Sequence, residues 1–366
     1  MKRLLIVGEI PAPYRVQVFI ELSKRWNTKI YFESAKDEKQ HDLWLQSSKL
    51  SCEILDNKLS IQHFLYDIAH VQEYNLVLLY NNCLKYSMLL EIVCKIKKIP
   101  YFINCDGCND IKESNLLKRR IKDYFMQGAV GYFAGGKIAR EYFEYHGADI
   151  SKVYIHNFTS LNQEDIDKEV INSAEKRVIR EKLSIHESFI IISVGRHIPC
   201  KGFDVLVKAA QYLGNEIGLY IIGGKPSGDI QKYCRENKIS NVHFLDFMDK
   251  KGLKEYYRAS DVFTLMTRGD TWGLVVNEAM ANGLPVITTN RCVAGKELIE
   301  EGVNGYIIDV DDLDSLIDRI IKLKKNHNLR NNMADSNICK IQKYTLKNMA
   351  DINIRAIEDF FNQNNI

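Results

Sequence analysis

Short runs of apolar residues alternate along this chain with segments whose apolar residues recur at helical spacing. In the first half, the runs predict strands at 4–7, 29–32, 76–80, 101–104, 131–134 and 153–156. The segments between them predict helices, for example at 16–25, 86–96 and 115–127. Alternation of this kind is typical of a parallel sheet that is covered by helices on both faces.

The second half repeats this pattern after a charged stretch at 160–187, which we expect to hold a linker and a helix over 165–183. Strands are predicted at 189–195, 219–222, 242–245, 262–265, 285–288 and 305–308. The pattern therefore predicts an α/β protein with two doubly wound, Rossmann-like domains facing across a cleft. We place the first domain at 1–165 and the second at 166–345, and we expect a C-terminal helix in 346–366 to pack back on the first domain.

Composition narrows the class of protein. The 366 residues suit two domains at about 150 residues each, and 46% hydrophobic with 27% charged residues is an ordinary globular balance. A formal net charge of +3 is too small to favour nucleic acid as the main partner. The apolar runs fall short of the roughly 18 residues of a membrane span. The apolar run at the N-terminus is too short for a signal peptide and is interrupted by Glu9, so we expect a cytoplasmic protein.

The nine cysteines are odd in number and irregularly spaced, which argues against a disulfide framework. Cys105 and Cys108 have redox or zinc spacing, but no second pair accompanies them. We interpret them as two buried thiols beside a loop, with a metal site as the alternative. No metal or cofactor is expected elsewhere.

Candidate site residues follow the predicted strands. Gly8, Asp106, Gly223 and Asp270 each come just after one, and Gly195 ends another. Ligands of open parallel sheets bind at the carboxyl ends of strands, so these positions predict a site in the cleft.

Two loops of the second half carry candidate chemistry. In Gly195-Arg-His-Ile-Pro-Cys-Lys-Gly202, Arg196 offers a planar fork and Lys201 a point charge, which together suit a pyrophosphate. The order of residues is not that of a Walker A loop, and a surface loop with two solvated cations is the alternative.

The second loop is Asp270-Thr-Trp-Gly-Leu-Val-Val-Asn-Glu278. Amides at Trp272, Gly273 and Leu274 would be helix-start donors for phosphate or sugar oxygens, and Glu278 could accept from a diol such as a ribose. Alternatively, the two acidic residues serve the helix dipole.

These motifs resemble those of the GT-B glycosyltransferases of family 4, which are retaining enzymes that use nucleotide-sugar donors. The resemblance covers about 189–310 and rests on Gly195-Arg196, Lys201-Gly202, Gly223-Gly224, Phe244-Leu-Asp-Phe247, Asp270…Glu278-Ala-Met-Ala, Ile287-Thr-Thr, Gly295, Glu297-Leu-Ile and Gly302-Val-Asn-Gly305. The first half is similar in layout, and its Pro11-Ala-Pro-Tyr-Arg15 loop and Asp106-Gly107 turn resemble members that build bacterial surface polysaccharides.

The resemblance implies roles for individual residues. Arg196 and Lys201 would bind the donor diphosphate and stabilise the leaving nucleotide, and Glu278 would hold the ribose. Asp270, Arg196, Lys201 and Asp106 would be the catalytic residues. The remaining donor contacts would come from Gly8, Gly195, Gly223, Phe247, Thr271, Trp272, Gly273 and Leu274, with Gly223 and Phe247 next to the base.

Three departures from the family pattern affect these roles. Asp270 stands where the first glutamate of a pair is usual, and Glu9-Ile-Pro-Ala-Pro replaces a paired glycine. Asp106 takes roughly the place of a histidine near the reacting carbon. It would make a different sugar contact or act as a weak base, or it simply belongs to a turn-forming Asp-Gly pair.

The stretch 116–125 mixes cations with Leu117, Ile121, Tyr124 and Phe125 near one helical face. It suits an anionic membrane surface, and a core-facing helix with a solvated basic face is the alternative.

We therefore expect a retaining hexosyltransferase that moves a sugar from a nucleoside diphosphate, with UDP as the expected nucleotide. The acceptor would be a glycan or a polyprenyl-linked oligosaccharide in capsule or O-antigen synthesis, met in the cytoplasm or at the inner face of the plasma membrane. A nucleotide-sugar epimerase, a phosphorylase of this architecture, and a catalytically silent nucleotide-binding protein are the alternatives.

Overall fold

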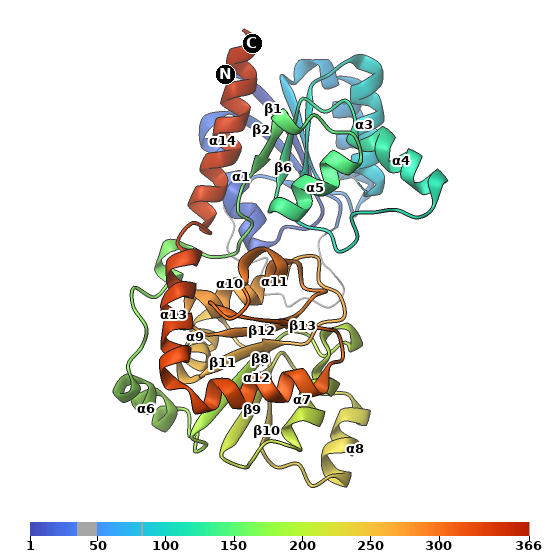
Figure 1. The fold of residues 1–366 in the computed structure, drawn as a ribbon. Coiled ribbons are helices and arrows are strands. Elements are labelled where there is room, and N and C mark those ends of the chain that lie inside the picture. Colours follow the sequence, from blue (N-terminus) through green and yellow to red (C-terminus); the bar gives the residue numbers. More distant parts are fainter. Residues whose placement is uncertain (35–49, 82, 366) are drawn as a thin grey trace. The chain divides into compact units, whose positions relative to one another are not determined.

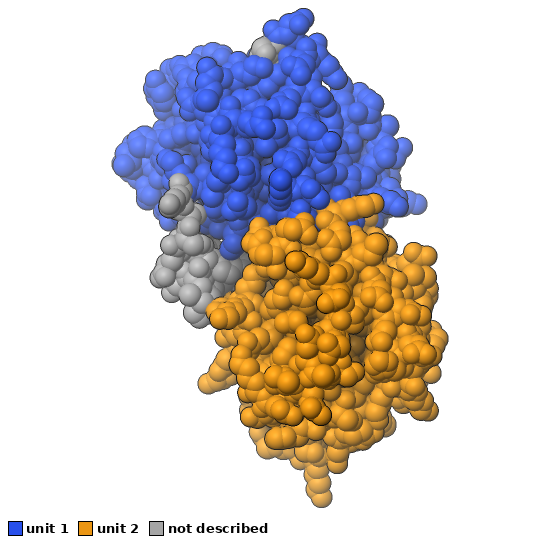
Figure 2. Space-filling model, turned by 90° about the vertical axis from the view of Figure 1, so that its left-hand side faces the viewer, with its two compact units in different colours: residues 1–160, 344–366 blue, residues 161–343 orange. Residues whose placement is uncertain are grey.

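The computed structural model describes residues 1–34, 50–81 and 83–365, and the chain divides into two compact units (Figure 2). Unit 1 comprises Met1–Ser160 together with Tyr344–Ile366, and unit 2 comprises Leu161–Lys343. Both ends of the chain therefore belong to unit 1.

Unit 1 is built on a seven-stranded parallel sheet in the order β3-β2-β1-β4-β5-β6-β7. Its strands are β1 (Arg3–Gly8), β2 (Asn27–Phe32), β3 (Glu53–Ile54), β4 (Leu76–Tyr80), β5 (Tyr101–Cys105), β6 (Gly131–Ala134) and β7 (Val153–Ile155). The helices are α1 (Pro13–Arg25), α2 (Lys58–Ala69), α3 (Lys85–Lys97), α4 (Leu116–Met126), α5 (Lys137–Tyr145) and α14 (Leu346–Gln363), with short 3-10 turns at Val71–Glu73 and Ile150–Lys152. Helices cover the sheet, which is why β4 is buried along its whole length and is apolar throughout.

Unit 2 has a six-stranded parallel sheet in the order β10-β9-β8-β11-β12-β13. Its strands are β8 (Phe189–Val194), β9 (Ile217–Ile222), β10 (Val242–Leu245), β11 (Val262–Leu265), β12 (Val286–Thr289) and β13 (Gly305–Ile308). The helices are α6 (Ser173–Lys182), α7 (Phe203–Ala210), α8 (Gly228–Glu236), α9 (Lys250–Ala259), α10 (Leu274–Ala281), α11 (Val293–Leu298), α12 (Leu313–Lys325) and α13 (His327–Ile341), with 3-10 turns at Gln163–Asp165 and Pro199–Lys201. The prediction of two doubly wound, Rossmann-like domains is confirmed.

The helix predicted over 165–183 is too long, because α6 begins only at Ser173. Asn172 caps it and forms a capping box with Glu175. Upstream, the amide of Asp167 donates to the carbonyl of Ala281 at 2.8 Å, and its carboxylate pairs with Lys254 at 2.9 Å. These long-range contacts hold the segment before α6 in a non-helical conformation, and the local sequence does not reveal them.

The C-terminal helix α14 lies beside α1 in unit 1 (Figure 1). The ring of Trp26 meets that of Phe361 at 6.2 Å, and the ammonium of Lys2 lies 4.1 Å from the Phe361 ring centre. Asn353 of α14 is fully buried and hydrogen-bonds both to His156 and to Tyr80. The last helix thus completes the core on one face of the first sheet.

Each sheet has one point at which the order of strands reverses. In unit 1 this switch point lies between β1 and β4, and in unit 2 it lies between β8 and β11. Loops that leave neighbouring strands on the two sides of such a point diverge, and the crevice they leave is where doubly wound sheets bind ligands.

A buried ion-pair cluster anchors α6 to the sheet of unit 2. Asp261 accepts from Lys176 at 3.1 Å, from Arg180 at 2.6 Å and from the amide of Ile190 at 2.8 Å. Burial alone would raise the pKa of Asp261, but the two cations and the amide outweigh it and lower that pKa overall.

Removing this carboxylate leaves two partly buried cations without their counter-ion. We expect Asp261→Ala to destabilise unit 2 by about 3–5 kcal/mol in denaturant unfolding. Because the folded-state pKa is lowered, the wild-type advantage is present above the unfolded pKa and shrinks as the pH falls through the folded one. Exposed Asp229 on α8 supplies the matched control, Asp229→Ala. An equal effect of both substitutions would contradict the anchoring role.

Candidate functional site

An ion pair between Lys201 and Asp270 lies at the switch point of unit 2. The Nζ atom of Lys201 and the Oδ2 atom of Asp270 are 2.5 Å apart. Lys201 comes from the loop after β8, and Asp270 comes from the loop after β11. Their side chains are only 17% and 15% exposed, so solvent screens this attraction weakly. The structure thus joins two residues that the sequence assigned separately to phosphate and sugar.

Glycines allow the loops around this pair to pack closely. Gly202 has φ +66°, and a Cβ atom there would lie 1.8 Å from the carbonyl oxygen of Met266. A Cβ atom on Gly223, at the end of β9, would lie 1.9 Å from the carbonyl oxygen of Gly195. Gly195 and Gly223 therefore touch through their backbones. Arg196, the next residue after Gly195, is exposed.

Arg268 holds the Lys201 loop in place through hydrogen bonds. The sequence did not identify it as a residue of the site. Its guanidinium donates to the carbonyl of Pro199 at 2.6 Å, to both oxygens of Asp204 at 3.0 and 2.8 Å, and to Asp311 at 2.9 Å. Its amide donates to the carbonyl of Cys200 at 2.7 Å. Burial raises the pKa of Asp204, but Arg268 outweighs it, so this pKa is lowered overall. The sequence feature that could have identified Arg268 is its position two residues before Asp270.

The segment that carries Asp270 is fixed by main-chain hydrogen bonds to the start of α11. The amide of Asp270 donates to the carbonyl of Arg291 at 3.1 Å, and the amide of Ala294 donates to the carbonyl of Trp272 at 2.7 Å. Gly273 turns the chain into α10 with φ +99°, and a Cβ atom there would lie 2.8 Å from the sulfur of Cys292. This backbone path sets the position of Asp270.

The residues that follow Asp270 differ in burial. Thr271 is exposed, whereas Trp272 is buried and donates from its indole to the side chain of Asn277 at 2.8 Å. The indole thus belongs to the core. Helix α10 begins at Leu274, and amides in the first turn of a helix have no intrahelical acceptor. Any ligand contact from Trp272, Gly273 and Leu274 would therefore be made by the main chain.

Glu278 lies one turn further along α10 and is half-buried. Its Oε2 atom accepts from the hydroxyl of Tyr257 at 3.1 Å. Burial and the charge of Glu278 raise the pKa of this phenol far above its ordinary value, so Tyr257 remains a donor. The hydrogen bond fixes a carboxylate that can accept from a diol.

Phe247 and His197 are two further side chains of this region. Phe247, after β10, is 52% exposed. His197 packs against the ring of Phe203 at 4.8 Å, and burial lowers its pKa, which keeps it neutral at pH 7. His197 therefore adds no charge to the Lys201 loop.

Gly8 and Asp106 belong to unit 1, where they lie at the carboxyl ends of β1 and β5. A Cβ atom on Gly8 would lie 3.0 Å from the ring of Phe32. Asp106 accepts from the guanidinium of Arg15 at 2.5 Å and from the side-chain amide of Asn104 at 2.8 Å. Asp106 is thus part of a defined polar network and does not simply shape a turn.

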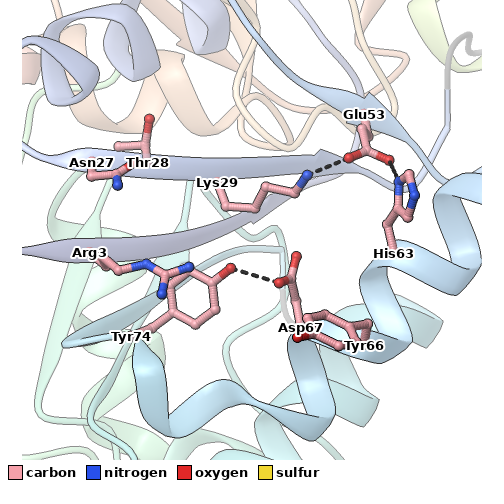
Figure 3. A pocket seen from close by; sticks show the side chains of 9 residues that line it. All are labelled: Arg3, Asn27, Thr28, Lys29, Glu53, His63, Tyr66, Asp67 and Tyr74. Atoms are coloured by element: carbon pink, nitrogen blue, oxygen red, sulfur yellow. Dashed lines mark hydrogen bonds and ion pairs between the residues drawn. The ribbon is translucent and has the colours of Figure 1, made fainter.

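A different hollow of unit 1, of about 400 Å³, lies at the amino-terminal ends of β1 and β2 (Figure 3). The charged residues that line it have partners: Glu53 pairs with Lys29 and with His63, Arg3 pairs with Glu73 at 2.7 Å, and Asp67 accepts from Tyr74 at 2.9 Å. These pairs fasten α2 and β3 to the sheet, so we assign this hollow to the fold.

Within the described ranges, no group of three or more His, Cys, Asp or Glu side chains is arranged to hold a metal ion. The nine cysteines, all within the described ranges, form no disulfide bonds. Cys105 and Cys108 are partly exposed rather than fully buried as expected, and burial still raises the pKa of Cys105 well above its usual value.

The close approach at Gly202 gives a direct test of the loop. Gly202→Ala forces a methyl group onto the Met266 carbonyl, so we expect a lower melting temperature and a displaced Lys201. Gly228→Ala is the matched control, because nothing lies within 4 Å of a Cβ atom there and the helical position favours alanine. Thermal unfolding of both variants measures the effect, and equal melting temperatures would contradict the tight packing.

Residues 175–338 match the family model described as glycosyl transferases group 1. An uncharacterized 41.2 kDa protein in the cps region of Klebsiella pneumoniae is 28% identical over 188 residues, which is 50% of this chain and 49% of that protein. An uncharacterized glycosyltransferase of Methanocaldococcus jannaschii is 23% identical over 297 residues, which is 74% of this chain and 82% of that protein. The chain spans about half the length of the first curated relatives it matches.

Among solved structures, Anabaena HepE in complex with UDP superposes with a TM-score of 0.78. It is 16% identical, and the match covers 98% of this chain and 100% of HepE. At this identity the likeness shows the fold, which is that of GT-B glycosyltransferases. The Lys201 and Asp270 loops fall inside the segment that the family model matches. Residues 175–338 are therefore similar to the group 1 glycosyl transferases.

Proposed function

We propose that this protein is a retaining glycosyltransferase that uses a nucleoside-diphosphate sugar, with UDP as the nucleotide. The observation that carries the proposal is the Lys201–Asp270 pair at the switch point of unit 2, within the segment that the group 1 family model matches. The complex of the similarly folded HepE with UDP supports the choice of nucleotide.

In this proposal, the donor diphosphate binds to Lys201 and Arg196, and the amides at the start of α10 add donors for its oxygens. The phosphate draws Lys201 toward itself, and Asp270 becomes available to hydroxyls of the sugar. Glu278, which Tyr257 fixes, accepts from the two ribose hydroxyls, and Phe247 and Gly223 border the base. These cations would stabilise the charge of the leaving nucleotide, so the proposal includes no metal ion.

The transfer step we propose is a front-face attack. The acceptor hydroxyl forms a bond to the anomeric carbon on the face from which the diphosphate departs. The bond between this carbon and the β-phosphate oxygen breaks, and the departing phosphate takes the hydroxyl proton. No protein nucleophile is required, and Lys201 and Arg196 act by electrostatic stabilisation.

For the acceptor, we propose a glycan or a lipid-linked oligosaccharide in surface-polysaccharide synthesis. The similarity to the Klebsiella pneumoniae protein in the cps region supports this class. Unit 1 would bind this acceptor.

We also propose that α4 binds an anionic membrane surface. Leu117, Ile121 and Tyr124 recur on one face of this helix and are exposed, and Met126 is its buried residue. Lys118 and Arg120 are exposed as well. The helix is therefore not the core-facing one considered as the alternative. Among residues 1–34, 50–81 and 83–365, no helix is long and apolar enough to cross a membrane.

Two enzymatic alternatives share this architecture. An epimerase would convert the nucleotide sugar without an acceptor, and a phosphorylase would need inorganic phosphate. A silent binding protein would bind the nucleotide and transfer nothing. Product analysis with and without acceptor and phosphate distinguishes all three from a transferase.

The donor roles predict different effects for two substitutions. Lys201→Ala removes charge stabilisation in the transition state, so we expect kcat to fall by about 100-fold or more. Glu278→Ala removes ribose binding, so we expect mainly a weaker nucleotide affinity. Steady-state kinetics and calorimetric titration with UDP measure both effects. Exposed Lys251 on α9 provides the control Lys251→Ala. Full activity of Lys201→Ala would refute the phosphate assignment.

The membrane proposal predicts that binding to phosphatidylglycerol vesicles depends on the charge of α4. Each basic residue near such a surface contributes about 1 kcal/mol, so we expect Lys118→Glu to weaken binding by about fivefold or more, and salt to weaken it further. Lys347→Glu on α14 is the exposed control in the same unit. Vesicle sedimentation that does not distinguish the two variants would argue against a docking role for α4.

A further inference from the structure

A buried cation lies at the carboxyl edge of the unit 1 sheet. The side chain of Arg15, from the first turn of α1, is only 8% exposed. Its guanidinium lies 4.5 Å from the ring centre of Tyr80 and 5.5 Å from that of Tyr14. Burial lowers the pKa of Arg15, but Asp106, Tyr14 and Tyr80 together raise it more, so the group remains charged.

Asp106 is held on both of its oxygens. Oδ2 accepts from Arg15 at 2.5 Å, and Oδ1 accepts from the side-chain amide of Asn104 at 2.8 Å. The carboxylate is nevertheless 28% exposed, so it can accept a further hydrogen bond from outside. Both protein partners are donors. They therefore hold the carboxylate in one orientation.

The network continues away from the charge pair. Asn353 of α14 donates to the hydroxyl of Tyr80 at 3.2 Å and hydrogen-bonds to Nδ1 of His156 at 3.1 Å. Burial lowers the pKa of His156 to about 4, so this ring is neutral at pH 7. Arg15 and Asp106 thus carry the two opposite charges of the network.

This polar network contains features that lower the stability of the folded protein. Among the described residues, Nη1 of Arg15, Oδ1 of Asn104 and Nε2 of His156 are buried without a hydrogen-bond partner. Each such group lowers the stability of the folded protein. A buried ion pair also gives no more stability than apolar side chains of the same volume. Structural compromises of this kind concentrate at functional sites.

We propose that Arg15 is a positioning residue for sugar transfer: it holds Asp106 as an oriented carboxylate that accepts a hydrogen bond from a hydroxyl of the reacting sugar. This inference rests on the proposed function. It assigns Asp106 the sugar contact rather than the base, and it gives the buried cation a role that the fold does not require.

The test uses Arg15→Gln, Asp106→Asn and the double variant, in the full chain. Each single variant leaves one charge of the pair without its partner, and the double variant replaces both charges by neutral groups of similar size. We expect both single variants to melt at lower temperatures and the double variant to recover most of the loss. We expect the activity to fall by about 100-fold in all three, because residues that act as a unit are not additive.

Activity is measured as release of UDP from a panel of UDP-sugars, with water as the acceptor. Calorimetric titration with UDP measures the nucleotide affinity of the proposed donor site in unit 2. The exposed pair Arg25–Glu358, 3.4 Å apart, gives the matched control Arg25→Gln with Glu358→Gln. Unchanged UDP affinity with reduced release in all three variants supports the positioning role.

Two results would overturn the inference in distinguishable ways. If the double variant regains both stability and activity, the pair is structural and Arg15 positions nothing. If the wild-type chain neither binds UDP nor releases it from any sugar, the proposed function fails, and the inference fails with it.

Discussion

The attraction between Lys201 and Asp270 joins the two loops that diverge at the switch point of unit 2. Most of the surrounding structure supports this contact. Gly202 allows the Lys201 loop to reach the Met266 carbonyl, and Arg268 ties this loop to Asp204 and Asp311. On the other side, Gly273 and the main-chain bonds to α11 set the path of the Asp270 segment. In the proposed function, this pair marks where the phosphate and the sugar hydroxyls of the donor bind.

Unit 1 repeats this arrangement with different residues. In each unit, a cation comes from the segment that follows the first strand at the switch point, namely Arg15 after β1 and Lys201 after β8. Each pairs with a carboxylate from the other side of that point, Asp106 after β5 and Asp270 after β11. The two pairs differ in exposure, because Arg15 is more deeply buried than Lys201. A buried cation suits a fixed scaffold, and a more accessible one suits a ligand that arrives and leaves.

The sequence predicted the strands well because buried parallel strands appear as short continuous apolar runs, as in β4 and β11. It also found the loops that carry Lys201 and Asp270, since these follow such runs directly. It overextended α6, because the contacts of Asp167 with Ala281 and Lys254 bridge residues far apart in the chain. Arg268 and the partner of Arg15 were missed for the same reason: which acceptors a guanidinium reaches depends on tertiary packing. The exposure of α4 could not be read from spacing, since an apolar stripe can face either the core or a membrane.

A crystal structure of the chain with UDP would show directly whether the Lys201–Asp270 pair is the donor site. We expect the diphosphate at the Nζ atom of Lys201, with the Lys201–Asp270 distance lengthened from 2.5 Å and the ribose at Glu278. A nucleotide bound elsewhere, with the Lys201–Asp270 pair intact, would contradict this assignment.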